Sequence, residues 1–255
     1  MKIASWNLAR GLSNADKARH INEGLDRIDA DIVFLPEAFD KTGQPVDPNF
    51  AENLGYTTLS VGYEDEEPHP SDEQYIVALS RVAVLLDNTR LATRNALSAN
   101  FELEGEDISV TGVHLDDRRE DIRTGMVDAF LTGRNPGVAH ALIGDLNAMH
   151  GDDLRAKVLS SAIARSRAES LKNKRARSLM RRLTDMASGD VMDLLEQTGM
   201  KDADSRHRPT MLMGGLAVVQ LDHFMHDERL RVTSFQAKRL KGSDHKAISG
   251  YLELA

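Results

Sequence analysis

The sequence predicts an α+β fold, a layered sandwich in which two packed β-sheets carry helices on their outer faces. Nine short apolar runs, rich in β-branched residues and bounded by polar ones, recur along the chain as buried strands do. Helical patterns are few, which argues against a regular alternation of strand and helix. No internal repeat or low-complexity linker divides the 255 residues, so we expect a single domain over residues 1–255.

The strands begin close to the N-terminus and continue to the C-terminus. The nine runs are Ile3–Leu8, Ile32–Leu35, Tyr56–Val61, Tyr75–Leu86, Ile108–Leu115, Val138–Ile143, Leu216–Met225, Leu230–Phe235 and Ala247–Leu254. A helix is expected over Asp16–Ala30, because apolar side chains from Ile21 to Ile28 fall on one helical face. A second helix is expected after Asp117, where apolar residues from Ile122 onward repeat that spacing.

A third helical region, at about residues 154–182, differs from the rest of the chain in charge. It holds ten Lys or Arg residues and one acid, Glu169, in a chain whose formal net charge is -8. Apolar residues step through its first part by four, as in a helix. Two interpretations stand side by side: a solvated helical hairpin with a basic outer face, or a clamp that binds a phosphate-rich substrate.

Composition excludes several classes of function. The chain has no cysteine, which excludes disulfide scaffolds, zinc–thiolate sites, iron–sulfur clusters and cysteine nucleophiles. Its acidic balance argues against a protein that coats nucleic acid by bulk charge. No apolar run reaches the roughly 20 residues of a membrane span, and Met1–Asn7 is typical of a strand rather than a signal peptide. We therefore expect a cytoplasmic protein.

Acids, amides and histidines stand at the ends of predicted strands in five separate segments. They are Asn7, Glu37, His114, Asp145 with Asn147, and Asp222 with Asp244 and His245. Each residue alone fits a turn, a helix cap or a core histidine. Their recurrence at the end of one strand after another favours a shared site.

These residues lie in six short motifs whose order resembles that of the endonuclease/exonuclease/phosphatase superfamily. The motifs are Trp6-Asn7, Pro36-Glu37, His114-Leu115, Gly144-Asp145-Leu146-Asn147, Leu221-Asp222-His223 and Ser243-Asp244-His245. The resemblance runs from residue 3 to about residue 253 and implies a four-layer α/β/β/α sandwich of two mostly antiparallel sheets. It departs from the family at Pro36, where Gln is more common.

The resemblance also implies a metal-dependent hydrolase of phosphate esters. Mg²⁺ is the expected ion, with Mn²⁺ as a possible substitute, and Asn7, Glu37 and Asp244 are the expected ligands. Mg²⁺ prefers one or two carboxylates and completes its octahedron with water and substrate phosphate, so no larger cage of acids is required. Such an ion neutralises the phosphate oxygens and stabilises the leaving oxygen.

Five residues receive catalytic roles from the same resemblance. Asp145 positions or deprotonates the attacking water, and Asn147 holds a phosphate oxygen through its amide. His245, oriented by Asp222, contacts the scissile phosphate as base or as cation. His114 is a second donor across the site. Whether Asp145 or His245 is the base is left open at this point.

Neighbouring positions have alternative interpretations. Glu73 resembles the acid that pairs with the first catalytic histidine in the deoxyribonuclease branch, and it equally fits a solvated acidic loop. Asp116 or Asp117 is expected to cap the following helix, while Arg118 or Arg119 lies close enough in sequence to approach phosphate. His223 adjoins Asp222, points to the other face of its strand and is expected to be structural.

The leading hypothesis is a Mg²⁺-dependent phosphoesterase that hydrolyses phosphodiester bonds, foremost a nuclease acting on DNA or RNA. The alternative is a phosphatase or phosphodiesterase for a small or lipid phosphoester such as an inositol phosphate. A third hypothesis is a catalytically silent member that binds a phosphorylated partner. The basic region at about 154–182 favours nucleic acid, whereas an aromatic content of 5% offers few stacking platforms for single strands.

Overall fold

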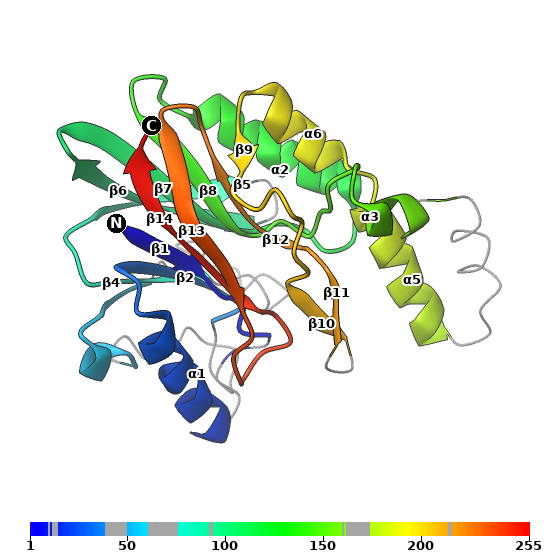
Figure 1. Cartoon of the computed structure of the whole chain (residues 1–255), viewed down its shortest axis with the longest axis horizontal. Helices are drawn as coiled ribbons and strands as arrows, with labels where there is room; N and C mark the ends of the chain where they lie inside the picture. The colour runs from blue at the N-terminus through cyan, green and yellow to red at the C-terminus, as the bar shows by residue number, and fades with distance from the viewer. Residues whose placement is uncertain are drawn as a thin grey trace, which may run out of the picture.

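The computed structural model describes residues 1–9, 11, 15–38, 50–60, 76–91, 94–159, 161, 174–213 and 216–255. Two six-stranded sheets pack face to face, and helices lie on the outer face of each (Figure 1). The predicted sandwich of two sheets with flanking helices is therefore confirmed. None of the helices within these ranges has both the length and the apolar character needed to cross a membrane.

The first sheet has the strand order β13-β14-β1-β2-β4-β3. Its strands are β1 (Lys2–Ser5), β2 (Ile32–Pro36), β3 (Thr57–Ser60), β4 (Ile76–Ser80), β13 (Leu230–Lys238) and β14 (Ala247–Leu254). Neighbours are antiparallel except for the parallel pair β1 and β2. Helix α1 (Ala15–Ile28) covers the outer face, where its buried Ile21 and Leu25 belong to the same apolar cluster as Trp6 and Val33. A short 3-10 helix, η1 (Glu52–Leu54), precedes β3.

The second sheet has the order β5-β6-β7-β8-β12-β9. Its strands are β5 (Leu85–Leu91), β6 (Arg94–Leu103), β7 (Glu106–His114), β8 (Ala139–Asp145), β9 (Lys201–Asp202) and β12 (Asp222–His226). Again one pair, β7 and β8, is parallel and the others are antiparallel. Helices α2 (Glu120–Gly133) and α6 (Asp190–Gln197) cover its outer face, where Met126 and Leu195 pack with Leu142.

The basic region and the small sheet lie together beside one end of the sandwich (Figure 1). Helices α3 (Leu154–Leu159) and α5 (Lys174–Met186) form the described part of the predicted hairpin, and residues 160 and 162–173 lie outside the described ranges. The two-stranded sheet consists of β10 (Met211–Met213) and β11 (Leu216–Val219). Met186 on α5 packs against Val219 on β11 and against Met149 after β8.

The interface between the two large sheets is the main apolar core. Phe34 of the first sheet and Phe224 of the second are fully buried there, in one cluster with Ile143 and Val110. Gly112 on β7 lies directly over Phe34, and a Cβ at that glycine would come within 2.2 Å of Phe34 Cδ1. The two sheets thus approach too closely at this point for a larger residue.

Truncating Phe34 is expected to destabilise the sandwich strongly. The Phe34→Ala variant should lower the free energy of unfolding by about 3–5 kcal/mol, because it leaves a cavity between two close-packed sheets. Urea unfolding followed by circular dichroism measures this. Leu85→Ala is the matched control, since 77% of Leu85 is exposed and the expected change is within about 0.5 kcal/mol. Equal losses for both variants would contradict this assignment of the core.

The two parallel pairs bring four predicted site residues to one end of the sandwich. Asn7 follows β1 and Glu37 follows β2, so both leave the carboxyl ends of the first pair. His114 and Asp145 are the last residues of β7 and β8 and lie opposite each other in register. Asp222, the first residue of β12, pairs with Asp145 across the antiparallel neighbour. The pairing of the strands is therefore sufficient to bring these side chains together.

Two of the predicted strands are wrong in extent. Tyr75–Leu86 was expected to be one strand, but its described part is β4 of the first sheet, a bend, and the start of β5 in the second sheet. Leu216–Met225 likewise divides into β11 and β12. In both cases two strands follow each other so closely that their apolar residues merge into one run. Strand β6 and helix α6 were missed.

Candidate active site

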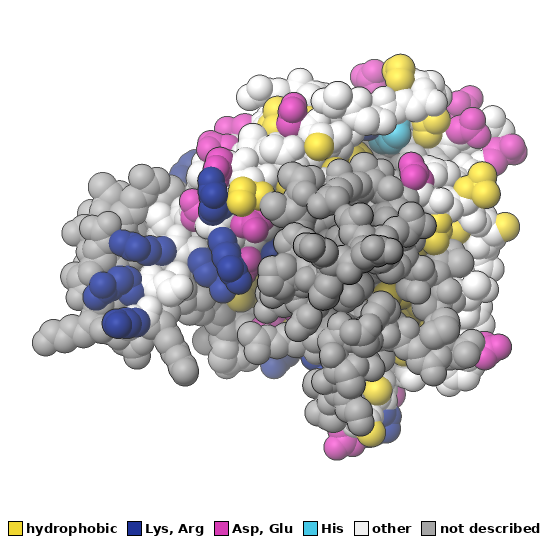
Figure 2. All heavy atoms as spheres, turned by 180° about the vertical axis from the view of Figure 1, so that it is seen from behind, with side chains coloured by type: hydrophobic (Ala, Val, Ile, Leu, Met, Phe, Trp, Pro, Cys, Tyr) yellow, Lys and Arg dark blue, Asp and Glu magenta, His cyan; other side chains and the backbone are white. Residues whose placement is uncertain are grey.

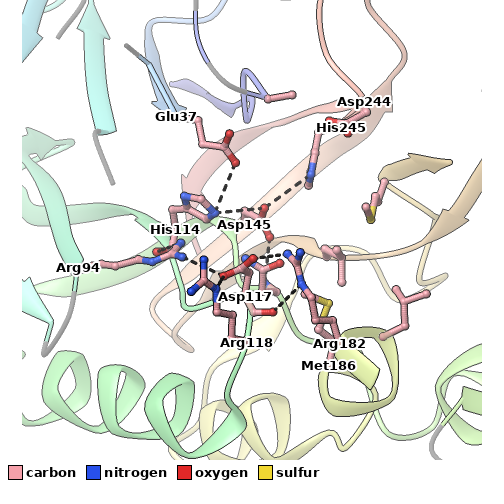
Figure 3. A pocket seen from close by; sticks show the side chains of 15 residues that line it. Glu37, Arg94, His114, Asp117, Arg118, Asp145, Arg182, Met186, Asp244 and His245 are labelled. Carbon is pink, nitrogen blue, oxygen red and sulfur yellow. Dashed lines mark hydrogen bonds and ion pairs between the residues drawn. The ribbon is translucent and has the colours of Figure 1, made fainter. Parts of the chain in front are cut away.

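A pocket of about 410 Å³ opens where the two parallel pairs end (Figure 3). The predicted residues on its wall are Glu37, His114, Asp145, Asn147, Asp244 and His245. Asn7 and Asp222 are fully buried behind the wall and bond to residues on it. All eight predicted site residues therefore lie at this one place, although they come from distant parts of the chain.

Asn7 connects the carboxylates of Glu37 and Asp145. Its Nδ2 donates to Glu37 Oε1 at 3.1 Å and to Asp145 Oδ2 at 3.0 Å, and its Oδ1 accepts the Ala9 N–H at 2.8 Å. Glu37 has a φ of 58°, in the left-handed region that side chains with a Cβ seldom adopt. Strained backbone of this kind is concentrated at functional sites, where it aims a side chain.

The segment around Asp145 is shaped by a glycine and by its own hydrogen bonds. Gly144 has a φ of 143°, and a Cβ there would lie 2.1 Å from the Val113 carbonyl oxygen, so only glycine allows β7 and β8 to approach next to the site. Asn147 donates its backbone N–H to Asp145 Oδ1 at 2.9 Å and its Nδ2 to the Leu115 carbonyl at 3.0 Å. The first bond fixes the orientation of the Asp145 carboxylate, and the second fixes the side chain of Asn147.

His245 is held on both sides by buried partners. Its Nδ1 donates to Asp222 Oδ2 at 2.9 Å, and its carbonyl accepts the Trp6 indole N–H at 3.2 Å. Burial disfavours the imidazolium, but the carboxylates of Asp222 and Asp145 outweigh it and raise the pKa of His245 to about 10. The two carboxylates therefore favour the imidazolium form of His245.

Two imidazoles from distant parts of the chain converge on the Asp145 carboxylate (Figure 3). His114 Nε2 lies 3.8 Å from both Glu37 Oε1 and Asp145 Oδ2, and His245 Nε2 lies 3.8 Å from the same Asp145 oxygen. Burial raises the pKa of Asp145 even though the charged His245 favours its carboxylate form. The two imidazoles, which can donate hydrogen bonds, and the Asp145 carboxylate, which accepts them, thus face the same small space at the base of the pocket.

A second wall of the pocket is built from arginines around one acid. Arg94 Nη2 lies 3.4 Å from Asp117 Oδ1 and Arg118 Nε lies 3.6 Å from it, while Arg182 pairs with Asp117 Oδ2. Arg94 also donates to the carbonyls of His114 and Leu115. Sequence reasoning missed Arg94 because it lies at the start of the unrecognised strand β6. The alternation of apolar residues from Leu97 to Leu103 could have revealed that strand.

The prediction that Asp116 or Asp117 caps α2 is wrong. The N-cap residue of α2 is Arg119, without a side-chain cap. Asp116 Oδ1 instead accepts the N–H groups of Arg118 and Arg119 at 2.8 Å each, which closes the turn before the helix. Asp117 turns toward the pocket arginines. Glu73 lies outside the described residues.

The sequence model of the Endonuclease/Exonuclease/phosphatase family matches residues 4–245. The chain belongs to this family. The match spans almost the whole sandwich and all eight residues of the site. The family assignment therefore makes the chain a phosphoesterase by descent, and the pocket described above lies at the end of the sheets where the six motifs meet.

Several solved structures share the fold at low sequence identity. A functionally unknown conserved protein from Enterococcus faecalis V583 has a TM-score of 0.68 at 15% identity, with 100% of each chain covered. The catalytic domain of human Nocturnin with a bound sulfate anion has a TM-score of 0.62 at 16% identity, covering 100% of this chain and 93% of that one. A mannosyl-6-phosphatase from Bacteroides thetaiotaomicron VPI-5482 has a TM-score of 0.62 at 11% identity, and 99% of each chain is covered. No curated protein matches the chain.

The donor set of this endonuclease/exonuclease/phosphatase site fits a hard divalent cation. The carboxylates of Glu37 and Asp145 meet at the same Asn7 nitrogen and the same His114 nitrogen, so two like charges lie close together. Oxygen donors from one or two carboxylates are what Mg²⁺ prefers. A second candidate grouping is buried beside it, since ligand atoms of Asp145, Asp222 and His245 lie within 4.8 Å of one another.

Asp244 occupies a different position from the other predicted metal ligands. It is exposed on the pocket wall, and Figure 3 shows it beside His245 and apart from Glu37. Its backbone carbonyl accepts the Leu212 N–H at 2.6 Å, which ties the end of the chain to β10. Its role as a metal ligand stays a prediction.

Proposed function

We propose that the chain is a Mg²⁺-dependent phosphodiesterase and that its substrate is DNA or RNA. The observation that carries the choice of substrate is a row of basic residues on α5 that begins at the pocket wall. The hydrolytic step depends on Asp145, His114 and His245, whose side chains converge at the base of the pocket.

Hydrolysis requires a proton acceptor for water and donors for the phosphate oxygens. Asp145 lies between two imidazoles, and it accepts the proton of the attacking water as the new P–O bond forms and the ester P–O bond breaks. His245 keeps its Nδ1–H on Asp222 and donates from Nε2 to a phosphate oxygen. His114 Nε2 donates from the opposite side, to the oxygen of the leaving group as the ester P–O bond breaks.

Asn7, Glu37 and Asp244 are the residues that would hold the ion. When bound, Mg²⁺ supplies positive charge that offsets the negative charge of the phosphate and of the leaving oxygen. Asn7 positions Glu37 and Asp145 together through one amide nitrogen, so metal binding and water activation depend on the same buried side chain. Mn²⁺, which also accepts oxygen ligands, is the expected substitute.

The basic row on α5 continues outward from the pocket. Arg182 lines the pocket, and Lys174, Arg177 and Arg181, at spacings of three and four residues, form a neighbouring face of the same helix. From Arg182 to Lys174 the helix extends about 12 Å, the rise of about three to four nucleotides. Figure 2 shows Lys and Arg side chains gathered at the end of the molecule that holds α5. A substrate with one phosphate needs no cations that far from the reacting atom.

Neutralising the outer part of this row is expected to weaken DNA binding selectively. The Lys174→Gln/Arg181→Gln variant should raise KM for duplex DNA. It should also reduce the slope of log affinity against log salt by about 0.9 for each phosphate that is no longer neutralised. Steady-state kinetics at several salt concentrations measure this. Turnover of bis(p-nitrophenyl) phosphate should stay unchanged, because both residues lie outside the pocket lining.

Arg231→Gln is the matched control for charge. Arg231 on β13 is exposed and pairs with Glu253 at 2.9 Å, outside the pocket. It should leave both KM and the salt slope as in the wild type. If the α5 variant behaved like this control, the basic row would have no role in substrate binding, and the nucleic-acid substrate would lose its support.

A small phosphoester is the second candidate, and the arginine wall favours it. Arg94, Arg118 and Arg182 surround Asp117 inside a pocket whose volume of about 410 Å³ suits a small ligand. A second phosphate on a sugar or an inositol would find guanidinium groups there. One similar structure is described as a mannosyl-6-phosphatase. If the protein hydrolysed such a phosphomonoester but neither DNA nor RNA, the small phosphoester would be the substrate class.

A further inference from the structure

A second cluster of titratable residues lies on the opposite face of β12 from Asp222. It draws on the loop after β8, on α6, on β9, on the loop after β9 and on β12. Its members are His150, Asp152, Glu196, Asp202, His207 and His223. Two of its subsets, one of them His150 with Asp152 and His207, have ligand atoms within 4.8 Å of one another. The proposed hydrolysis uses none of these residues.

The inner half of the cluster is a hydrogen-bonded support. Asp202 Oδ2 accepts from His223 Nδ1 at 2.7 Å and from His150 Nε2 at 2.9 Å. His223 Nε2 donates to the Ala148 carbonyl at 2.9 Å, so both of its ring nitrogens are already engaged. His223 is fully buried and serves to hold Asp202, in line with the structural role expected for it. Asp202 in turn fixes the ring of His150.

The outer half of the cluster reaches the solvent and pairs each of two imidazoles with an exposed carboxylate. His150 Nδ1 faces Glu196 Oε1 at 3.3 Å, and His207 Nε2 faces Asp152 Oδ1 at 3.3 Å. The two imidazole rings lie 4.3 Å apart between centroids. His207 Nδ1 is buried with no hydrogen-bond partner among the described residues. The side chains of Asp152 and Glu196 are 74% and 53% exposed, so an ion can enter from water.

We propose that His150, His207 and Asp152 form a Zn²⁺ site, with Glu196 or water as the fourth ligand. Two imidazoles and a carboxylate suit Zn²⁺, whereas Mg²⁺ prefers oxygen alone. Asp202 behind His150 gives the arrangement in which a carboxylate orients a metal-bound histidine through its other nitrogen. This chemistry is distinct from that of the oxygen-rich pocket.

The position of the site indicates what the ion does. His150 follows Asp145 and Asn147 on the loop after β8, and His207 precedes Thr210. The Thr210 hydroxyl accepts the N–H of Asp222 at 3.0 Å, and Asp222 holds His245. A shared ion would therefore tie the two loops that support Asp145 and Asp222. The ion would have a structural role behind the active site and would not contact the substrate.

Zinc stoichiometry tests this proposal directly. The protein is stripped with EDTA, dialysed against Zn²⁺ and analysed for bound metal per chain, with the thermal midpoint measured in parallel. At about 100 times the dissociation constant, Zn²⁺ should raise the midpoint by about 5–10 °C. His207→Gln should lose one equivalent of Zn²⁺ and this shift. Glu37→Gln should keep both, which separates the site from the catalytic pocket.

Two further variants make the result decisive. Asp152→Asn changes an exposed side chain that does not threaten folding, and it should weaken Zn²⁺ binding at least about tenfold. His20→Gln is the matched control, because His20 pairs with Glu23 on α1 in an ordinary helical contact. It should bind Zn²⁺ as the wild type does. Unchanged stoichiometry and affinity in both His207→Gln and Asp152→Asn would overturn the proposal.

Discussion

Replacing Asp145 with Asn is expected to lower kcat by about 10²–10⁴-fold with little change in KM. Asparagine keeps the size of the side chain and one oxygen that accepts a hydrogen bond, but it cannot accept the proton of the attacking water. His245 is a poor replacement, because its Nδ1–H is held by Asp222, and that carboxylate still favours the charged ring in the variant. Steady-state kinetics at saturating Mg²⁺ on a labelled duplex and on bis(p-nitrophenyl) phosphate measure both constants.

A matched variant separates chemistry from general damage to the protein. Asp26→Asn makes the same substitution at an exposed position on α1, away from the pocket, and should retain full activity. Circular dichroism should show both variants folded. If Asp145→Asn kept more than about a tenth of the wild-type kcat, the proton acceptor would have to be another group.

The Glu37→Gln variant is expected to need at least about tenfold more Mg²⁺ for half-maximal activity. Glutamine keeps an oxygen for the Asn7 N–H but removes the negative charge that favours a cation. The left-handed backbone at this position directs the side chain in the same way in both proteins. A loss of Mg²⁺ affinity would therefore result from the missing charge and not from a displaced side chain. A titration of activity against Mg²⁺ gives the apparent affinity.

Glu106→Gln provides the control for this substitution. Glu106 is exposed at the start of β7, the end of the strand opposite to His114. It should leave the Mg²⁺ titration unchanged. The same half-saturating Mg²⁺ concentration for Glu37→Gln and wild type would rule out Glu37 as a ligand.

The sequence predicted the sandwich and its site because local patterns determine both. Strands β1, β2, β7 and β8 are buried apolar runs, and each of the first site residues comes directly at or after the end of one. Parallel pairing then places Asn7, Glu37, His114 and Asp145 at one end of the sheets. The order of these short motifs was therefore enough to predict both the fold and the place where the site residues meet.

The remaining features depend on packing between distant segments. Arg94, Asp117 and Arg182 come from β6, a turn and α5, and only packing brings them together around one carboxylate. The division of Tyr75–Leu86 into β4 and β5 was likewise invisible, because two buried strands separated by a short bend look like one run. The proposed Zn²⁺ site could not be predicted either, because His150 and His207 are 57 positions apart in the sequence and lie together only in the folded protein.

The most direct test of the account is a cleavage assay on duplex and single-stranded DNA, RNA and a small phosphoester. Each substrate is incubated with wild-type protein in Mg²⁺, in Mn²⁺ and in EDTA, and with the Asp145→Asn variant in Mg²⁺. We expect hydrolysis that needs the metal, is lost in EDTA and falls at least about 100-fold in the variant. Hydrolysis of none of these substrates in either metal, or equal hydrolysis by the variant, would contradict a metal-dependent phosphoesterase at this site.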